Sequence, residues 1–359
     1  MDDIITDIKS LPLNEFCKKY NMPLLLPKRY LLADNPRYQW AEDAWLNQNK
    51  VGWIYDEVPV IEDKKDWDLL GEDSQNLLKK LFLFFTQIEV EVNKIYLKYI
   101  ELFQPFEIKK MLIKYAEVET MHAAAYKYLM VNLFGEKTND MMHEFLEYQT
   151  MVEKYETLQD YKLDTLENLM ITMVMFGAFS EGVLLYASFA IFLFYPYVRK
   201  KLKGMGDLLS WSNRDESLHV SSMALLFKEI LKESPSVTKM IIEPQVYSKA
   251  KQMVELEWHF IDWIFENINL DVINNNNKEI GNNLNPKILK EYIAYKANVR
   301  LKQFGFQPMY PVEQNPLKWM DFFGTIEFSN FFETTVTEYN KVKSENLTND
   351  DVDDLFSDF

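Results

Sequence analysis

Cysteine, glycine and proline are scarce in this sequence, and each scarcity excludes a class of architecture. Cys17 is the single cysteine among 359 residues, which excludes an intramolecular disulfide and leads us to expect a reducing compartment, with the cytoplasm as the default. Ten glycines and 13 prolines are few for this length, which disfavours a turn-rich β architecture. Hydrophobic residues reach 48% and aromatic residues 15%. These values predict an all-α protein with a sizeable core.

Positive charge is also in short supply. The chain has 39 basic and 55 acidic residues, a net charge of −16, and no local basic patch. Such a surface repels phosphate backbones and anionic lipids, so we expect neither a nucleic-acid nor a membrane partner. The first residues, "MDDIITDIKSL", lack a basic segment followed by an apolar one, so we expect no secretory signal.

One apolar stretch imitates a transmembrane helix. Residues 169–198 carry a single charge, Glu181, and would be long enough to cross a bilayer. However, a carboxylate near the centre of a span costs about 2.5 to 3.5 kcal/mol, and the sequence offers no second candidate span to pair with it. We therefore interpret the stretch as the central helix of a large bundle, in which Glu181 is a buried carboxylate that needs a partner.

Helical periodicity divides the chain into three parts. In residues 1–70, prolines are spaced so that only short helices fit between them. Residues 71–323 are predicted to form a helical domain. Its helices are expected over residues 73–103, 105–135, 139–157, 165–195, 204–233, 245–268 and 286–303.

The third part, residues 324–359, is predicted to be a flexible tail. Apolar periodicity decays along it, and the last 16 residues hold six acids and no base, a composition that cannot fold alone. Leu355, Phe356 and Phe359 nevertheless interrupt the acidity. These apolar anchors suggest a tail that orders on a partner.

Two of the four histidines share one local pattern, Glu-x-x-His. The stretch "AEVETMHAAAY" pairs Glu119 with His122, and "RDESLH" pairs Glu216 with His219. Residues three apart lie on one face of a helix, so each pair presents a carboxylate oxygen and an imidazole nitrogen to the same point. Each pair is predicted to form half of a metal site.

A site of this kind needs two further carboxylates. In di-metal carboxylate bundles, two helices each supply Glu-x-x-His and two others each supply one glutamate. Glu181 is the lone charge of the apolar stretch, and Glu89 lies in "FFTQIEVEV", on the helix before the first motif. Glu91 competes with Glu89, but the two lie about 200° apart around a helix, so we expect that both cannot face the core.

The donor set indicates which metals suit the site. Hard carboxylate oxygens with one imidazole per metal favour iron or manganese over zinc; we expect two iron ions, with Mn/Fe and Mn/Mn pairs left open. His143 and His259 lack a glutamate three residues before them and are interpreted as ordinary residues. The spacing alone predicts a di-metal carboxylate bundle, a class that includes ferroxidases, hydroxylases and radical generators.

Around these residues the sequence resembles the radical-generating small subunit of class I ribonucleotide reductase, from about Trp40 to the C-terminus and in matched order. "ETMHAAAY" resembles the first Glu-x-x-His of that family followed by the radical tyrosine, which implies this role for Tyr126. "RDESLH" and "FSEGVLLYASF" resemble the second motif and the segment around the solitary glutamate. The same register implies that Glu89, not Glu91, is the first ligand.

The resemblance also implies a route for the radical. Trp53, in "KVGWIYDEVP", matches the electron-relay tryptophan, and Asp215 matches the aspartate that links it to the metal-bound histidine, here His122. Tyr339, in "VTEYNKV", matches the tail tyrosine that passes the radical toward the large subunit. The acidic tail that follows resembles the peptide that docks on that subunit.

The implied mechanism needs a dry pocket around the tyrosine. Reduced metals bind O₂, and the oxidised cluster removes one electron and one proton from Tyr126, while Leu185 and Phe189 would exclude reductants. Two positions depart from the family pattern. Glu89 resembles the manganese/iron members, which lack the tyrosine, and Ser212 places a hydroxyl where the radical pocket tends to be apolar.

We therefore predict a homodimeric small subunit of ribonucleoside-diphosphate reductase with a ferritin-like fold and extra helices. The large subunit must supply the redox thiols, because Cys17 is the single cysteine here. Two alternatives are a di-iron oxidase or hydroxylase acting on a substrate in its own cavity, and a ferritin-like metal-binding protein. The first leaves Trp53, Asp215 and the tail without a role, and the length and the single ligand set argue against the second.

Overall fold

The computed structural model describes residues 1–26, 35–135, 138–144, 147–157, 161–274, 283–321 and 323. Over these residues the regular secondary structure is helical throughout, so the all-α prediction is confirmed. The N-terminal part consists of short elements whose buried side chains join the same hydrophobic core as the bundle. They are α1 (Asp2–Ser10), α2 (Leu13–Tyr20), α3 (Gln39–Lys50), η1 (Tyr55–Glu57) and α4 (Ile61–Leu69).

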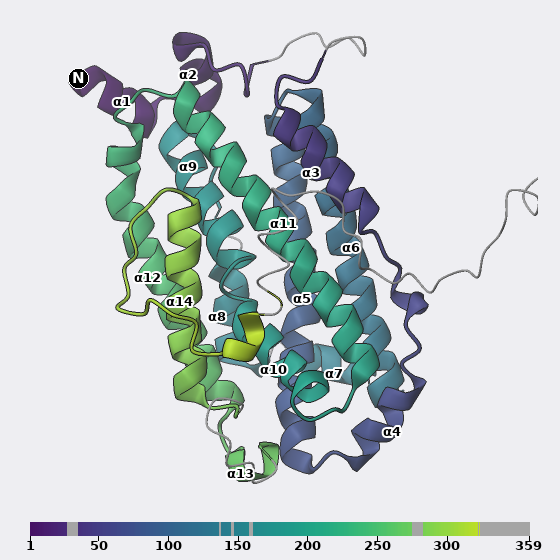
Figure 1. Ribbon diagram of the computed structural model, residues 1–359. Helices are drawn as coiled ribbons and strands as arrows, with labels where there is room; N and C mark the ends of the chain where they lie inside the picture. Colours follow the sequence, from purple (N-terminus) through teal and green to yellow (C-terminus); the bar gives the residue numbers. More distant parts are fainter. Residues whose placement is uncertain are drawn as a thin grey trace, which may run out of the picture.

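Long helices form the bundle itself. α5 and α6 are joined by a three-residue turn and pack side by side, α11 runs beside them, and α12 and α14 lie on the opposite side of the molecule (Figure 1). The long helices are α5 (Glu72–Leu102), α6 (Phe106–Phe134), α11 (Lys203–Glu233), α12 (Thr238–Ile264) and α14 (Pro286–Gln303). Shorter elements are α7 (Thr138–Glu144), α8 (Gln149–Thr157), α9 (Leu166–Val174), the π-helix η4 (Met175–Ser180), α10 (Tyr186–Tyr197), α13 (Leu270–Ile273) and η5 (Lys318–Met320).

Several predicted helix ends agree with the structure, and local chemistry explains them. Pro105 is the N-cap residue of α6, where a missing N–H group breaks no helical hydrogen bond. Gly135 follows the helix with φ of 65°, a backbone conformation that glycine adopts without strain.

Other boundaries were predicted wrongly. The single helix expected over 139–157 is two, α7 and α8. α12 begins at Thr238 and contains Pro244, and α10 continues through Pro196 for one residue. α11 packs closely against Pro196 at Gly206. A Cβ atom at this glycine would lie only 2.5 Å from the proline ring, so a larger residue would not fit there.

The largest difference concerns the apolar stretch, which is not one continuous helix. After α9 the backbone widens into η4, where Leu184 N–H donates to the Phe179 carbonyl five residues earlier, at 2.8 Å. Residues 181–185 then form turns before α10 begins. π-Helical insertions of this kind are frequent at functional sites, and this one places Glu181 at the break. No helix in the described ranges is long and apolar enough to cross a membrane.

Two buried cations bind carbonyl groups in this break, which we call the Glu181 turn (residues 181–185). Arg300 Nε on α14 donates to the Gly182 carbonyl at 3.2 Å. Lys154 Nζ on α8 donates to the Leu184 carbonyl at 2.8 Å. Because buried carbonyls that leave a helical ladder need new donors, these two side chains stabilise the turn.

Candidate metal centre

Six acidic and imidazole side chains converge inside the bundle. They come from α5, α6, the Glu181 turn and α11, and each is buried to 1% exposure or less. One group of ligand atoms belongs to Glu89, Glu119, His122 and Glu216, and a second group belongs to Glu119, Glu181, Glu216 and His219. Within each group, all the atoms lie within 4.8 Å of one another. Glu119 and Glu216 are common to both groups, so they can bridge two cations.

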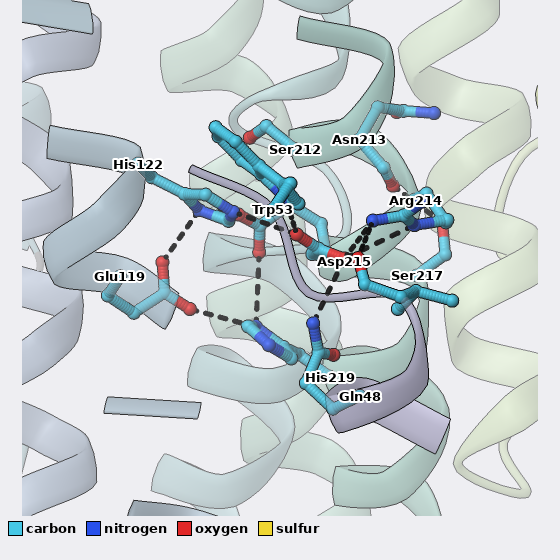
Figure 2. Close-up of polar contacts among 12 residues, drawn as sticks. Gln48, Trp53, Glu119, His122, Ser212, Asn213, Arg214, Asp215, Ser217 and His219 are labelled. Atoms are coloured by element: carbon cyan, nitrogen blue, oxygen red, sulfur yellow. Dashed lines mark hydrogen bonds and ion pairs between the residues drawn. The ribbon is translucent and has the colours of Figure 1, made fainter. Parts of the chain in front are cut away.

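Both histidines turn the same ring nitrogen toward the acidic side chains. His122 Nδ1 lies 3.1 Å from oxygens of both Glu119 and Glu216. His219 Nδ1 lies 2.8 Å from Glu119 Oε1 and 3.7 Å from Glu216 Oε2. Figure 2 shows His122 and His219 on either side of the Glu119 carboxylate. Helical i, i+3 spacing produces this arrangement, as the sequence predicted.

The carboxylate oxygens fit a cation-binding role. Within the described ranges, neither oxygen of Glu89 or Glu181 makes a hydrogen bond, although all four oxygens are buried. Burying unpaired carboxylates is expensive unless a cation or a proton compensates them. Oxygen donors with one imidazole per group suit iron or manganese, so the residues present fit the metal pair expected from the sequence.

The pKa values of the cluster reflect this crowding. Burial raises the pKa of Glu89 and of Glu181 well above the usual range of a carboxyl group. Burial acts in the same direction on Glu119, but His219 and His122 outweigh it and lower its pKa to about 2. Burial opposes the charging of His219, but Glu119 outweighs burial and raises the pKa of the imidazole to about 10. Metal binding would therefore have to displace protons held by Glu89, Glu181 and His219, whose pKa values are raised, and none from Glu119.

Asp215 lies behind His122, on the side away from the cluster. Its Oδ2 is 3.4 Å from His122 Nε2 and accepts a hydrogen bond from Trp53 Nε1 at 2.7 Å. Gln48 Nε2 and the Arg214 guanidinium donate to Oδ1 at 3.0 and 3.1 Å (Figure 2). Burial acts to raise the pKa of Asp215, but the charge of Arg214, followed by His122 and the hydrogen bond from Trp53, lowers it below its usual range.

The structure thus brings Trp53 and Asp215 together with His122. The Trp53 ring also stacks on the His122 ring, with centroids 5.9 Å apart and planes at 20°. Gln48 and Arg214 were missed by sequence reasoning. Arg214 had one signal, its place beside Asp215 in "RDESLH", whereas Gln48 had none.

Tyr126 lies one turn beyond His122 on α6 and is fully buried. Its ring centroid is 5.2 Å from that of Phe85, which in turn contacts Phe189 at 5.1 Å. Leu185 and Phe189 are fully buried as well. Burial, followed by the charge of Glu89, raises the pKa of the Tyr126 phenol well above its usual range, so the phenol keeps its proton.

Two further tyrosines border the His219 side and were not predicted, because tyrosine is common in this chain. The Tyr115 ring lies 4.1 Å from the His219 ring and the Tyr96 ring 5.8 Å from it. Tyr115 Oη shares a 2.6 Å hydrogen bond with Ser222 Oγ. These aromatic rings complete the dry surroundings of the second group.

Glu91 corrects one sequence argument. It is buried like Glu89, so the expectation that both cannot be buried in the core was wrong. Its Oε1 accepts from Lys94 Nζ at 2.6 Å and from the Tyr155 hydroxyl on α8 at 2.9 Å, away from the cluster. α5 is covered on more than one side, so helical phase alone could not separate the two residues. His143 and His259 are exposed, in line with their interpretation as ordinary residues.

Metal-free protein offers a test of the cluster's electrostatics. Replacing Glu181 with Met should raise the free energy of unfolding of metal-free protein by about 1 to 3 kcal/mol, because a buried polar group without a partner is removed. Burial raises the pKa of Glu181, so folding of the wild type becomes less favourable as pH rises above the ordinary carboxyl range. The stability advantage of Glu181→Met over the wild type should therefore grow from pH 5 to pH 8. Urea unfolding at both pH values measures it.

The matched control is Glu91→Met, which removes a buried carboxylate that has partners. This variant should lose stability where Glu181→Met gains it. Equal losses in the two variants would contradict the view that Glu181 is a buried carboxyl group without a hydrogen-bond partner.

A helical bundle with a buried carboxylate and histidine cluster shared between two ligand groups defines a protein of the ferritin-like class. Residues 33–316 match the family described as "Ribonucleotide reductase, small chain". The chain belongs to this family of ribonucleotide reductase small subunits. The matched range ends before the tail, and Tyr339 and residues 324–359 lie outside the described part of the chain.

Relatives from viruses and bacteria carry the same designation. A protein of Invertebrate iridescent virus 3, described as a probable ribonucleoside-diphosphate reductase small subunit, is 32% identical over 344 residues, covering 88% of this chain and 87% of the relative. The ribonucleoside-diphosphate reductase subunit beta of Halalkalibacterium halodurans is 26% identical over 325 residues, covering 87% and 89%. The predicted enzyme class is therefore confirmed.

Solved structures support the fold. The ribonucleotide reductase R2 subunit from Clostridium botulinum superposes with a TM-score of 0.71 at 20% identity, covering 84% of this chain and 99% of that one. The dimanganese(II)-NrdF of Streptococcus sanguinis gives a TM-score of 0.71 at 17% identity, covering 83% and 99%. As a small subunit of this family, the chain works with a large subunit.

Proposed function

We propose that this chain generates and stores the radical that its large subunit uses to reduce ribonucleotides to deoxyribonucleotides. Two metal ions, held by the six converging side chains, would supply the chemistry: with O₂ they provide the oxidising power to remove an electron and a proton from a phenol. The observation that carries the proposal is the pair of ligand groups that share Glu119 and Glu216. The oxidising equivalent rests on Tyr126 or on the metal centre.

The protein's own contribution begins with the orientation of the ligands. When the His122 ring is neutral, a proton on Nε2 would be shared with Asp215, 3.4 Å away, and Nδ1 would direct its lone pair at the first ligand group. Arg214 and Gln48 hold the Asp215 carboxylate in that position. Glu89 and Glu181 each belong to one group and are proposed to bind one metal each.

A second contribution is a path for the electron. Contacts run from His122 through Asp215 to the Trp53 indole, whose ring is partly exposed and lies 5.5 Å from the Trp211 ring. We propose that Trp53 relays the electron between the cluster and the surface, where Tyr339 and the tail would receive the radical for the large subunit. Leu185 and Phe189 keep water and reductants from Tyr126.

The metal pair is proposed to be iron, with Mn/Fe and Mn/Mn as alternatives; the dimanganese relative with this fold keeps manganese in consideration. Metal analysis of anaerobically loaded protein, followed by paramagnetic resonance after O₂ is added, tests this. We expect two metals per chain and a radical signal. Deletion of residues 340–359 should abolish activity with the large subunit and leave both results unchanged; metal-loaded protein without any O₂-dependent signal would contradict the proposal.

A homodimer is also proposed, and two exposed apolar stripes on neighbouring helices support it. Val90 and Leu97 lie two turns apart on α5 with 43% and 52% exposure, and Phe106 and Ile113 lie two turns apart on α6 with 52% and 53%. Apolar side chains grouped in this way on two packed helices are typical of a protein interface. The α5–α6 face therefore fits a second copy of this chain.

Charging this face should separate the copies. We expect Leu97→Lys combined with Ile113→Lys to convert the dimer to monomer in sedimentation analysis, because the interface would have to bury two unpaired ammonium groups. Met240→Lys on α12 is the control, since Met240 is 61% exposed on another helix. A dimer that persists in the double variant would assign the interface elsewhere.

A further inference from the structure

Tyr126 has a hydrogen-bond partner beside the aromatic ring of Phe85. In the described part of the chain, its phenol oxygen makes one hydrogen bond, to Ser212 Oγ, and either oxygen can be the donor. Both residues are fully buried. Tyr126 lies one turn after His122 on α6, and Ser212 lies one turn before Glu216 on α11. The bond therefore joins the two helices that carry the Glu-x-x-His motifs.

We propose that Ser212 is a positioning residue that donates its hydroxyl proton to the Tyr126 oxygen, before and after oxidation, and so favours storage of the oxidising equivalent on the tyrosine. This inference rests on the proposed function, in which the centre oxidises a phenol. In this proposal, Ser212 decides whether the oxidising equivalent is stored on Tyr126 or on the metal centre.

The chemistry fixes the direction of the bond. Oxidation breaks the phenol O–H bond; one electron and one proton pass to the O₂-activated metal centre, and a neutral phenoxyl radical remains. The radical oxygen has no hydrogen and can only accept a bond, so Ser212 must donate to it. A serine hydroxyl is too weak a base to keep the phenol's proton. If Ser212 also donates in the reduced state, the phenol O–H is left to face the metal centre, and oxidation requires no rearrangement.

The hydrogen bond from Ser212 should stabilise the oxidised form of Tyr126 more than the reduced form. The C–O bond of a phenoxyl radical has carbonyl character, which makes its oxygen a better acceptor than a phenol oxygen. Tyr126 is fully buried, and Ser212 is the hydrogen-bond partner that the described residues give its phenol oxygen, so the protein itself must supply the donor. Ser212 therefore stabilises the oxidised tyrosine more than the reduced one. Loss of the hydroxyl should lower the ratio of tyrosyl radical to oxidised metal centre by a factor of roughly 2 to 10.

A pair of variants of equal size separates the hydroxyl from packing. Ser212→Thr keeps the donor and Ser212→Val lacks it, so added bulk affects both alike. In O₂-treated protein, high-field paramagnetic resonance should give a larger g1 for Ser212→Val, with loss of the exchangeable proton coupling. Ser212→Thr should keep both wild-type features. Ser222→Ala, which breaks the Tyr115 bond elsewhere on α11, should change neither.

Metal-free protein tests the bond without any radical. With an isotope-labelled tyrosine at position 126, the phenol C–O infrared band should shift in Ser212→Val and stay unchanged in Ser222→Ala. A tyrosyl signal with the same g1 and proton coupling in wild type and Ser212→Val, or an unshifted infrared band, would overturn the role of Ser212 alone. The absence of a tyrosyl signal in the wild type would overturn storage on Tyr126, and with it this inference.

Discussion

Replacing Tyr126 with Phe is expected to abolish nucleotide reduction with the large subunit while the metal content stays unchanged. The substitution removes one hydroxyl from a buried ring and touches none of the six converging side chains. Removing a group that acts only as part of a catalytic unit abolishes the activity of the whole unit. We therefore expect nucleotide-reducing activity to fall below about one hundredth of the wild-type value. The tyrosyl resonance signal should disappear with the activity.

Tyr115→Phe is the matched control for this experiment. Tyr115 is also fully buried near the cluster and also shares a hydrogen bond with a serine of α11. Both variants lose one hydrogen bond and should lose about 1 kcal/mol of stability. If Tyr126→Phe keeps full activity, the tyrosine is an ordinary core aromatic and the metal centre itself stores the oxidising equivalent.

A large loss of stability is expected when the buried ion pair of Lys154 and Glu257 is broken. Lys154 Nζ lies 2.5 Å from Glu257 Oε2 and 3.8 and 3.9 Å from the ring centroids of Phe84 and Phe260. Burial lowers the pKa of Lys154 to about 8 and raises that of Glu257 to about 7, so the apolar surroundings oppose both charges. Breaking such a pair leaves an uncompensated group inside the core.

Lys154→Met should therefore lower the free energy of unfolding by about 3 to 5 kcal/mol, measured by urea unfolding. Adding Glu257→Leu should restore part of the loss, since the unpaired carboxyl group is then gone while the Leu184 carbonyl still lacks the Lys154 donor. Lys94→Met is the control: its partner Glu91 is buried, but the Lys94 side chain is 55% exposed, and we expect a change of about 1 kcal/mol or less. A double variant no more stable than Lys154→Met would refute this account.

The convergence of the six acidic and imidazole side chains was foreseeable because its signals are local. A Glu-x-x-His pair is visible within four residues, and Glu181 stands out as the one charge in a long apolar stretch. Helical phase did not separate Glu89 from Glu91, because both are buried. Helical phase separates two positions only when one side of the helix faces water, and α5 is buried on more than one side.

The break at Glu181 could not be predicted. In a uniformly apolar stretch, hydrophobic periodicity carries no information about the local backbone, so η4 and the turn after it leave no pattern in the sequence. The side chains that hold Asp215 and the Glu181 turn in place could not be predicted from the sequence either. Gln48, Lys154 and Arg300 lie far along the chain from the groups they bind, and a polar residue on a helix is ordinarily expected to face solvent.

The hydrogen bond from Arg300 to the Gly182 carbonyl has a consequence for synthesis on the ribosome. Arg300 is translated more than one hundred residues after Glu181. The nascent chain can form α5, α6 and much of the core earlier, but the turn that carries Glu181 lacks one of its two cationic donors until α14 has emerged. If the six side chains hold metals as proposed, we expect loading at the end of translation or in the released protein, when both donors of the turn are in place.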